Sequence, residues 1–215
     1  MKTHTLLITS LFIAALSATN LFAADIHLPG PLKDGGVSAL RAIDVRGSAE
    51  NEAFPTGQIT MEDLSTILWA ASGRNRDGAK WTVPTGKWRP PYTRIYVTLE
   101  SGSYRYEWDG HRLIQVSDVD ARAHIPQQQF AQQAPAALYF VGDGEALSAF
   151  DDIPAWQEEF PLVLAGAMSQ NVYIASEAVG VGARVVYSVK RDAMTEYFHL
   201  STHDRPFFAM FLGKR

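Results

Sequence analysis

Cysteine is absent from this chain of 215 residues. The protein therefore has no disulfide, no thiolate nucleophile and no cysteine for lipid attachment. A strong excess of one charge is missing too, because 23 acidic residues face 19 Lys and Arg, for a net charge of −4. Such a balance provides no cationic field for nucleic acid. We expect the partners to be small molecules or another protein chain.

A hydrophobic run long enough to span a membrane is also missing from the N-terminus. The apolar segment from Leu6 to Ala18 has about 13 residues, whereas a spanning helix needs about 20. It follows Lys2 and precedes Ala23 and Ala24, a pattern typical of a secretory signal peptide over residues 1–24. A retained anchor is the less favoured alternative. We expect a soluble mature protein, periplasmic or secreted, without a stable membrane anchor.

The sequence lacks the usual motifs for protein-based catalysis. It has no phosphate loop and no nucleophile elbow, and GVGAR at Gly180 lacks the strand and the third glycine of a dinucleotide fingerprint. Only His199 and His203 have the spacing of a ligand pair, but that segment is expected to be a loop without a third ligand, so no metal site is predicted. Any chemistry would then come from an organic cofactor.

A short helix is the best-defined element of the sequence. Apolar residues repeat at helical spacing from Leu64 to Ala71, which predicts one buried face. Thr60 and Asp63 form a capping pair at its start, and Gly73 is expected to end it in the left-handed conformation.

The rest of the chain mixes helices with strands of antiparallel type, which favours an α+β domain. Residues 25–41 are interpreted as an arm and the start of a first helix, and residues 42–215 as the domain. The Asp109-Gly110 pair predicts a hairpin. Strands are predicted at 94–99, 103–108, 111–116, 136–141, 184–189 and 206–212, and helices at 37–43, 162–179 (started by Pro161 and mostly buried) and 191–198.

Three segments together resemble a known family. They are LWAASGRNR at 68–76, the pair Pro84-Thr85, and GAMSQNVYIASEAVGVGARVV at 166–186. This combination is similar to the nitroreductase-like flavoprotein superfamily, and more narrowly to its SagB-type dehydrogenase branch. The resemblance implies a central, mainly antiparallel sheet flanked by helices, an intertwined homodimer, and FMN bound at the dimer interface.

The resemblance also assigns residues to the FMN phosphate. The family's Arg-x-Ser-x-basic motif corresponds to Arg46 and Ser48, but Glu50 stands at the basic position. Lys214 and Arg215 match the basic residues that follow a glycine near the family's C-terminus. These assignments require the two ends of the chain to meet in one cationic cavity, because the phosphate carries nearly two negative charges.

The flavin ring has its own implied contacts. The Pro-Ser motif of the family corresponds to Pro84-Thr85, followed here by Gly86, and Trp88 and Pro90 stand where the family has amides. Arg89 or Lys87 is the hypothesised replacement for the amide donors. Ser188 and Val189 lie where the family presents a backbone N–H to flavin N5.

Each assignment has a structural alternative. Trp88 and Tyr92 are expected to form the substrate wall, but aromatic residues also simply pack. Arg46 could equally form a surface ion pair. The amide of Asn171 can satisfy backbone groups. Arg74, Arg76 and Lys80 either clamp a ligand or form a solvated turn.

The sequence thus predicts an exported FMN-dependent oxidoreductase that transfers two electrons to or from a small molecule. The flavin would carry the redox step, so no catalytic side chain is assigned. The alternative is a flavin-free relative that acts as a periplasmic binding or accessory protein, because Glu50, Trp88 and Pro90 depart from the family pattern and fold does not fix function.

Overall fold

A computed structural model describes residues 25–85 and 89–215. Its centre is a seven-stranded sheet in the order β1-β6-β5-β4-β7-β9-β8, in which neighbouring strands are antiparallel. The strands are β1 (Ile26–His27), β4 (Thr93–Leu99), β5 (Gly102–Glu107), β6 (Arg112–Ser117), β7 (Ala136–Gly142), β8 (Val181–Val186) and β9 (Arg205–Lys214). A separate two-stranded hairpin pairs β2 (Arg74–Asn75) with β3 (Lys80–Trp81).

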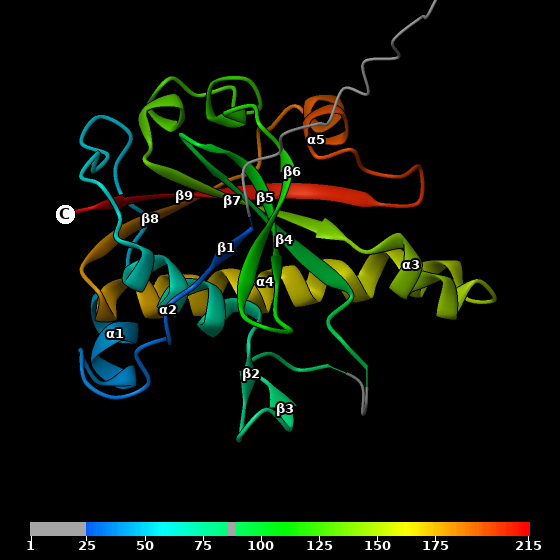
Figure 1. Cartoon of the computed structure of the whole chain (residues 1–215), viewed down its shortest axis with the longest axis horizontal. Helices are drawn as coiled ribbons and strands as arrows, with labels where there is room; N and C mark the ends of the chain where they lie inside the picture. The colour runs from blue at the N-terminus through cyan, green and yellow to red at the C-terminus, as the bar shows by residue number, and fades with distance from the viewer. Residues whose placement is uncertain (1–24, 86–88) are drawn as a thin grey trace, which may run out of the picture.

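Helices cover both faces of the sheet, which confirms the predicted α+β class. Figure 1 shows the long helix α4 across one face with α1 and α2 beside its C-terminal half, and α5 on the other side. The helices are α1 (Ala39–Val45), α2 (Met61–Ser72), α3 (Gly144–Leu147), α4 (Pro154–Ala178) and α5 (Arg191–Tyr197), with 3-10 turns η1 (Ala121–Ala123), η2 (Phe130–Gln133) and η3 (Ser148–Phe150).

The interior strand β7 separates two hydrophobic clusters. All of its residues are buried, as its apolar sequence predicts. Because side chains alternate along a strand, Phe140 packs with the α2 and α4 side while Tyr139 packs with Phe198 and Phe211 on the α5 side. The sheet therefore lies between two hydrophobic cores.

The start of α2 is confirmed, but its end differs from the prediction. The Thr60 hydroxyl accepts a hydrogen bond from the Asp63 backbone N–H at 3.1 Å, as a capping residue should. Gly73 ends the helix with a φ of −86°, not in the left-handed conformation. The chain leaves the helix directly into β2, so extended backbone is required there.

Helix α4 begins earlier than predicted. It starts at Pro154, and Pro161 lies inside the helix, so the assignment of Pro161 to the first turn was wrong. Both prolines satisfy the same rule for a first-turn position, and the rule alone does not choose between them. The prediction that α4 is mostly buried also fails in part, because Leu162 and Val163 are 43% and 70% exposed.

The edge strand β8 was predicted too late in the sequence. It begins at Val181, where it pairs with Lys214 of β9, and it ends at Val186. Residues 187–189 therefore follow the strand and do not belong to it. The predicted signal peptide at residues 1–24 lies outside the described residues. No helix in the described part of the chain is long and apolar enough to cross a membrane.

Candidate functional site

The two ends of the domain meet beside β8 and β9. The backbone N–H of Ala49 donates to Ala183 O at 2.9 Å, and that of Lys214 donates to Gly57 O at 2.8 Å. Gly213 makes this approach possible, since a Cβ at this position would lie 1.7 Å from Pro55 O. Small-molecule sites typically measure about 300–1,000 Å³. The cavity beside these two ends measures about 510 Å³.

This terminal cavity contains both acidic and basic groups. Its lining includes Ser48, Glu50, Glu177 and Arg215. The Arg215 guanidinium donates to both carboxylate oxygens of Glu177, at 2.6 and 2.8 Å, and Glu177 has a side chain only 8% exposed. The hydrogen bond to Glu177 raises the pKa of Arg215 despite partial burial. The Arg215 charge is therefore already balanced.

Lys214 is balanced in the same way. Its Nζ donates to Asp63 Oδ2 at 2.7 Å and to the Val179 carbonyl at 2.6 Å. Asp63 lies in the first turn of α2, where a negative charge is favoured by the helix dipole. Both C-terminal cations thus have carboxylate partners from helices.

Arg46 and Ser48 contact a residue that the sequence did not point to, Tyr173 on α4. The Arg46 guanidinium lies 4.7 Å from the Tyr173 ring centroid, and Ser48 Oγ lies 2.7 Å from the Tyr173 hydroxyl. That hydroxyl also accepts from the Val185 N–H at 2.9 Å. Tyr173 and Glu177 are four residues apart on one helix, so they lie on the same side of it. This spacing is the sequence signal that could have placed the two side chains together.

The residues assigned to a flavin ring lie elsewhere. Thr85 lines a cavity of about 410 Å³ with Tyr92, Phe160 and Val163. Gly86 and Trp88 lie outside the described residues, as does Lys87. Tyr92 is 8% exposed and packs against Phe150 and Phe160 at centroid distances of 5.3 and 6.2 Å. This contact supports the packing alternative for Tyr92.

Three further assigned residues also have partners within the chain. The Arg89 guanidinium lies 5.4 Å from the Phe150 ring centroid. The Val189 N–H donates to Tyr187 O at 2.9 Å, and Ser188 Oγ accepts from the Gln128 side-chain amide. In the single chain, the Val189 N–H is therefore not available to a ring nitrogen.

The residues assigned to the phosphate and those assigned to the flavin ring lie at different positions along α4. Val163 shares a cavity with Thr85, and Tyr173 contacts Ser48, ten residues further along α4. At 1.5 Å per residue, the two positions lie about 15 Å apart along the helix axis. Thr85 and Ser48 therefore belong to different cavities of one chain.

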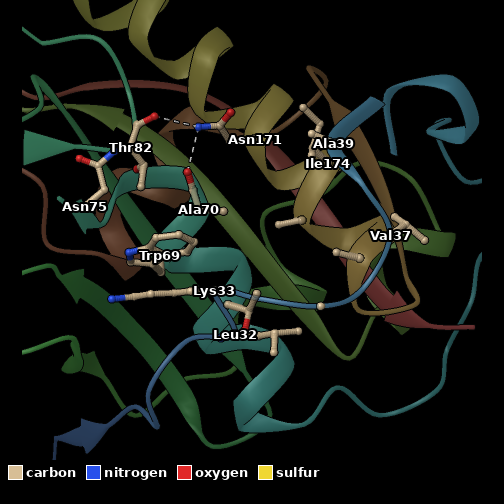
Figure 2. A pocket seen from close by; sticks show the side chains of 14 residues that line it. Leu32, Lys33, Val37, Ala39, Trp69, Ala70, Asn75, Thr82, Asn171 and Ile174 are labelled. Atoms are coloured by element: carbon tan, nitrogen blue, oxygen red, sulfur yellow. Dashed lines mark hydrogen bonds between the residues drawn. The ribbon is translucent and has the colours of Figure 1, made fainter. Parts of the chain in front are cut away.

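A third cavity lies between the N-terminal arm, α2 and α4. It measures about 370 Å³, and Figure 2 shows Lys33 beside Trp69 at its edge. Asn171 Nδ2 donates to Ala70 O at 2.9 Å and to Thr82 O at 3.3 Å (Figure 2). Asn171 thus joins α4 to the end of α2 and to the segment after β3, which supports its backbone-satisfying alternative.

Comparison with known proteins identifies the fold. The sequence profile of the nitroreductase family matches residues 53–214, most of the chain. The chain belongs to the nitroreductase family. A comparison with proteins of curated function gave no match.

Several solved structures have the same architecture. A protein described as a nitroreductase from Ralstonia eutropha JMP134 is 29% identical, with a TM-score of 0.78 over 88% of this chain and 89% of that one. One from Anabaena variabilis is 16% identical, with a TM-score of 0.71 over 88% of this chain and 41% of that one. The E. coli microcin synthetase McbBCD complex contains a chain 14% identical, with a TM-score of 0.65 over 98% and 84%.

Members of the nitroreductase family generally bind flavin, usually FMN. The terminal cavity does not fit the FMN phosphate in its present arrangement, because Glu177 neutralises Arg215, Asp63 neutralises Lys214, and Glu50 adds a negative charge. A phosphate dianion would have to displace the Glu177 carboxylate. Across the described residues, no group of three or more His, Asp or Glu side chains is placed to hold a metal ion.

Proposed function

We propose that this protein is an exported, FMN-dependent oxidoreductase of the nitroreductase family, acting as a homodimer on a small molecule. The family match over residues 53–214 is the observation on which this proposal depends. When bound, the flavin would supply two-electron chemistry that no side chain of the protein provides. The SagB-type branch is part of the proposal and is supported by the segments at 68–76 and 166–186.

The proposed binding residues form two groups. Arg46, Ser48, Lys214 and Arg215 would bind the phosphate end, after Arg215 exchanges Glu177 for phosphate. Thr85, Gly86, Arg89, Ser188 and Val189 would surround the ring, with Trp88 and Tyr92 toward the substrate.

A homodimer would unite these groups. Leu162 and Val163 are exposed apolar residues of α4, and Val163 lines a cavity with Thr85. Near the other end of α4, α1 exposes Leu40 and Ile43 (Figure 1). A two-fold axis that pairs two α4 helices antiparallel places the Thr85 end of one chain near the Ser48 end of its partner. Covering these side chains also removes apolar surface from water.

Flavin titration of the mature chain tests the cofactor. We expect the purified protein to show the visible absorption bands of flavin, or to acquire them with added FMN. Arg46→Ala should weaken FMN binding. Arg41→Ala should not, because Arg41 lies on α1, which Arg46 follows, but pairs with Asp44 at the surface. Colourless protein that does not bind added FMN would contradict the proposal and favour the accessory role.

Light scattering tests the dimer. Val163→Asp should give a monomer, because it buries a charge in the proposed interface. Val119→Asp is the matched control, since Val119 is also an exposed valine but follows β6. A dimer that persists in Val163→Asp would contradict the proposed pairing.

Cell fractionation tests export. The proposal predicts a mature protein that begins near Asp25 in the periplasm or the medium, and removal of residues 1–24 should retain it in the cytoplasm. Recovery of the full-length chain in the cytoplasm alone would contradict export.

A further inference from the structure

Another polar cavity lies under the β2–β3 hairpin, and none of the residues assigned to the phosphate lines it. It measures about 430 Å³, and its lining includes Arg74, Arg76, Lys80, Trp81 and Trp108. Among the described residues, none of the side chains that line it is acidic. Figure 1 shows this hairpin standing away from the main sheet on the α4 side. The cavity therefore combines positive charge with aromatic surface.

The hairpin register places Arg74 against Trp81. The two residues are directly opposite in the β2–β3 pair, and the guanidinium carbon lies 4.3 Å from the Trp81 ring centroid. The turn that follows β2 has three consecutive residues with positive φ, Arg76, Asp77 and Gly78. Trp69 Nε1 donates to Arg74 O at 2.7 Å and attaches the hairpin to α2. The hairpin pairing and the Trp69 side chain thus fix the position of Arg74.

The stacked guanidinium retains capacity for an anion. Stacking uses the face of Arg74, and one of its nitrogens donates to Gly78 O at 3.2 Å, so N–H groups in its plane remain for a carboxylate. Within the described ranges, the Arg76 side chain donates only to Asn75 Oδ1, at 3.4 Å. Across residues 25–85 and 89–215, neither arginine forms an ion pair.

The aromatic side of the cavity has a defined geometry as well. Trp81 and Trp108 are perpendicular, with centroids 5.2 Å apart, so they form a corner that a flat ring can occupy. Arg94 lies 5.2 Å from the Trp108 centroid, but its charge is balanced by Asp143 at 2.5 Å. The charges available to a ligand therefore come from the hairpin.

We propose that this cavity binds a planar aromatic acid, an aromatic ring that carries a carboxylate, and that this acid is the substrate of the neighbouring flavin site. The carboxylate pairs with Arg74 and Arg76 while the ring packs into the corner of Trp81 and Trp108. Thr85 lines this cavity and is also a proposed ring contact of the flavin. The role of this acid as a substrate rests on the proposed function, whereas its binding to the cavity does not.

Isothermal titration calorimetry on the full mature chain tests the site with a charged and a neutral probe of the same shape. We expect 2-naphthoate to bind at least about tenfold more tightly than 2-naphthamide, because only the former has a charge to pair. Arg74→Gln and Arg76→Gln should each weaken 2-naphthoate about tenfold and leave 2-naphthamide unchanged. Trp81→Leu should weaken both probes.

Lys190→Gln is the matched control, because it removes one exposed positive charge at the start of α5, on the other face of the sheet. Its 2-naphthoate affinity should equal that of the unaltered protein. Equal affinities for the two probes, absence of binding, or an equal loss in Lys190→Gln and Arg74→Gln would overturn the proposal. Flavin content is measured in the same samples, so binding of 2-naphthoate without flavin keeps the site and rejects only its role as a substrate site.

Discussion

The terminal cavity and the hairpin cavity are both lined by basic side chains. They differ in whether carboxylate partners balance the positive charge. Arg215 lines the terminal cavity and pairs with Glu177, and its neighbour in the chain, Lys214, pairs with Asp63. Arg74 instead stacks on Trp81 and forms no ion pair among the described residues. A basic residue is available to an anionic ligand only when no carboxylate already balances it, so partners matter more than the number of cations.

The largest expected contrast between the two regions concerns glycine. Gly213→Ala should destabilise the protein by about 3 kcal/mol, because its Cβ would overlap Pro55 O. Gly78→Ala should cost only about 1 kcal/mol, because this position has positive φ but open space around it. Urea unfolding of the two variants measures both values. Similar costs would show that the terminal segments do not pack as closely as described.

An acidic residue introduced into the hairpin should remove the difference in charge balance between the two cavities. Ala79→Glu adds a carboxylate to the lining of the hairpin cavity. We expect 2-naphthoate affinity to fall about tenfold, because the new charge both pairs with the arginines and repels the ligand. Ala79→Gln, which adds a side chain of the same length without the charge, should bind as before. Calorimetry distinguishes the two, and an equal loss in both would assign the effect to shape.

The smallest effect concerns the Lys214 pair. Asp63→Asn should lower the unfolding free energy by about 1 kcal/mol, because the ion pair and the favourable charge at the start of α2 are both lost. Glu62→Gln changes the same helical turn without an ion pair to Lys214 and should cost less. Urea unfolding compares them, and equal costs would mean that the ion pair adds nothing.

Much of the fold could be predicted because its signals are local. The Thr60 cap and the Asp109-Gly110 turn each depend on residues within one turn of chain, and both elements are where the sequence placed them. The start of α4 was missed because Pro154 and Pro161 carry the same local signal. Trp156, in the helical turn before Pro161, packs against Phe150 and Phe160, a contact that the proline rule does not consider.

Less of the candidate site could be predicted from the sequence. The family motif located Arg46, Ser48 and the C-terminal cations, but it gave no information about their partners. Glu177 is 38 positions from Arg215, and Asp63 is 151 positions from Lys214. Such long-range pairs form because the fold brings residues of α2 and α4 to the C-terminal end of the chain. Charge balance at the site therefore had to come from the structure.

We expect Glu177 to control how strongly the terminal cavity can hold a phosphate. The most direct test is an absorbance titration of the unaltered protein and of Glu177→Gln with FMN and with riboflavin, which lacks the phosphate. Glu196→Gln on α5 serves as the control. We predict that Glu177→Gln binds FMN about tenfold more tightly while riboflavin and the control are unchanged, because Arg215 is released and a repelling charge is removed. Unchanged or weaker FMN binding in Glu177→Gln would contradict the account.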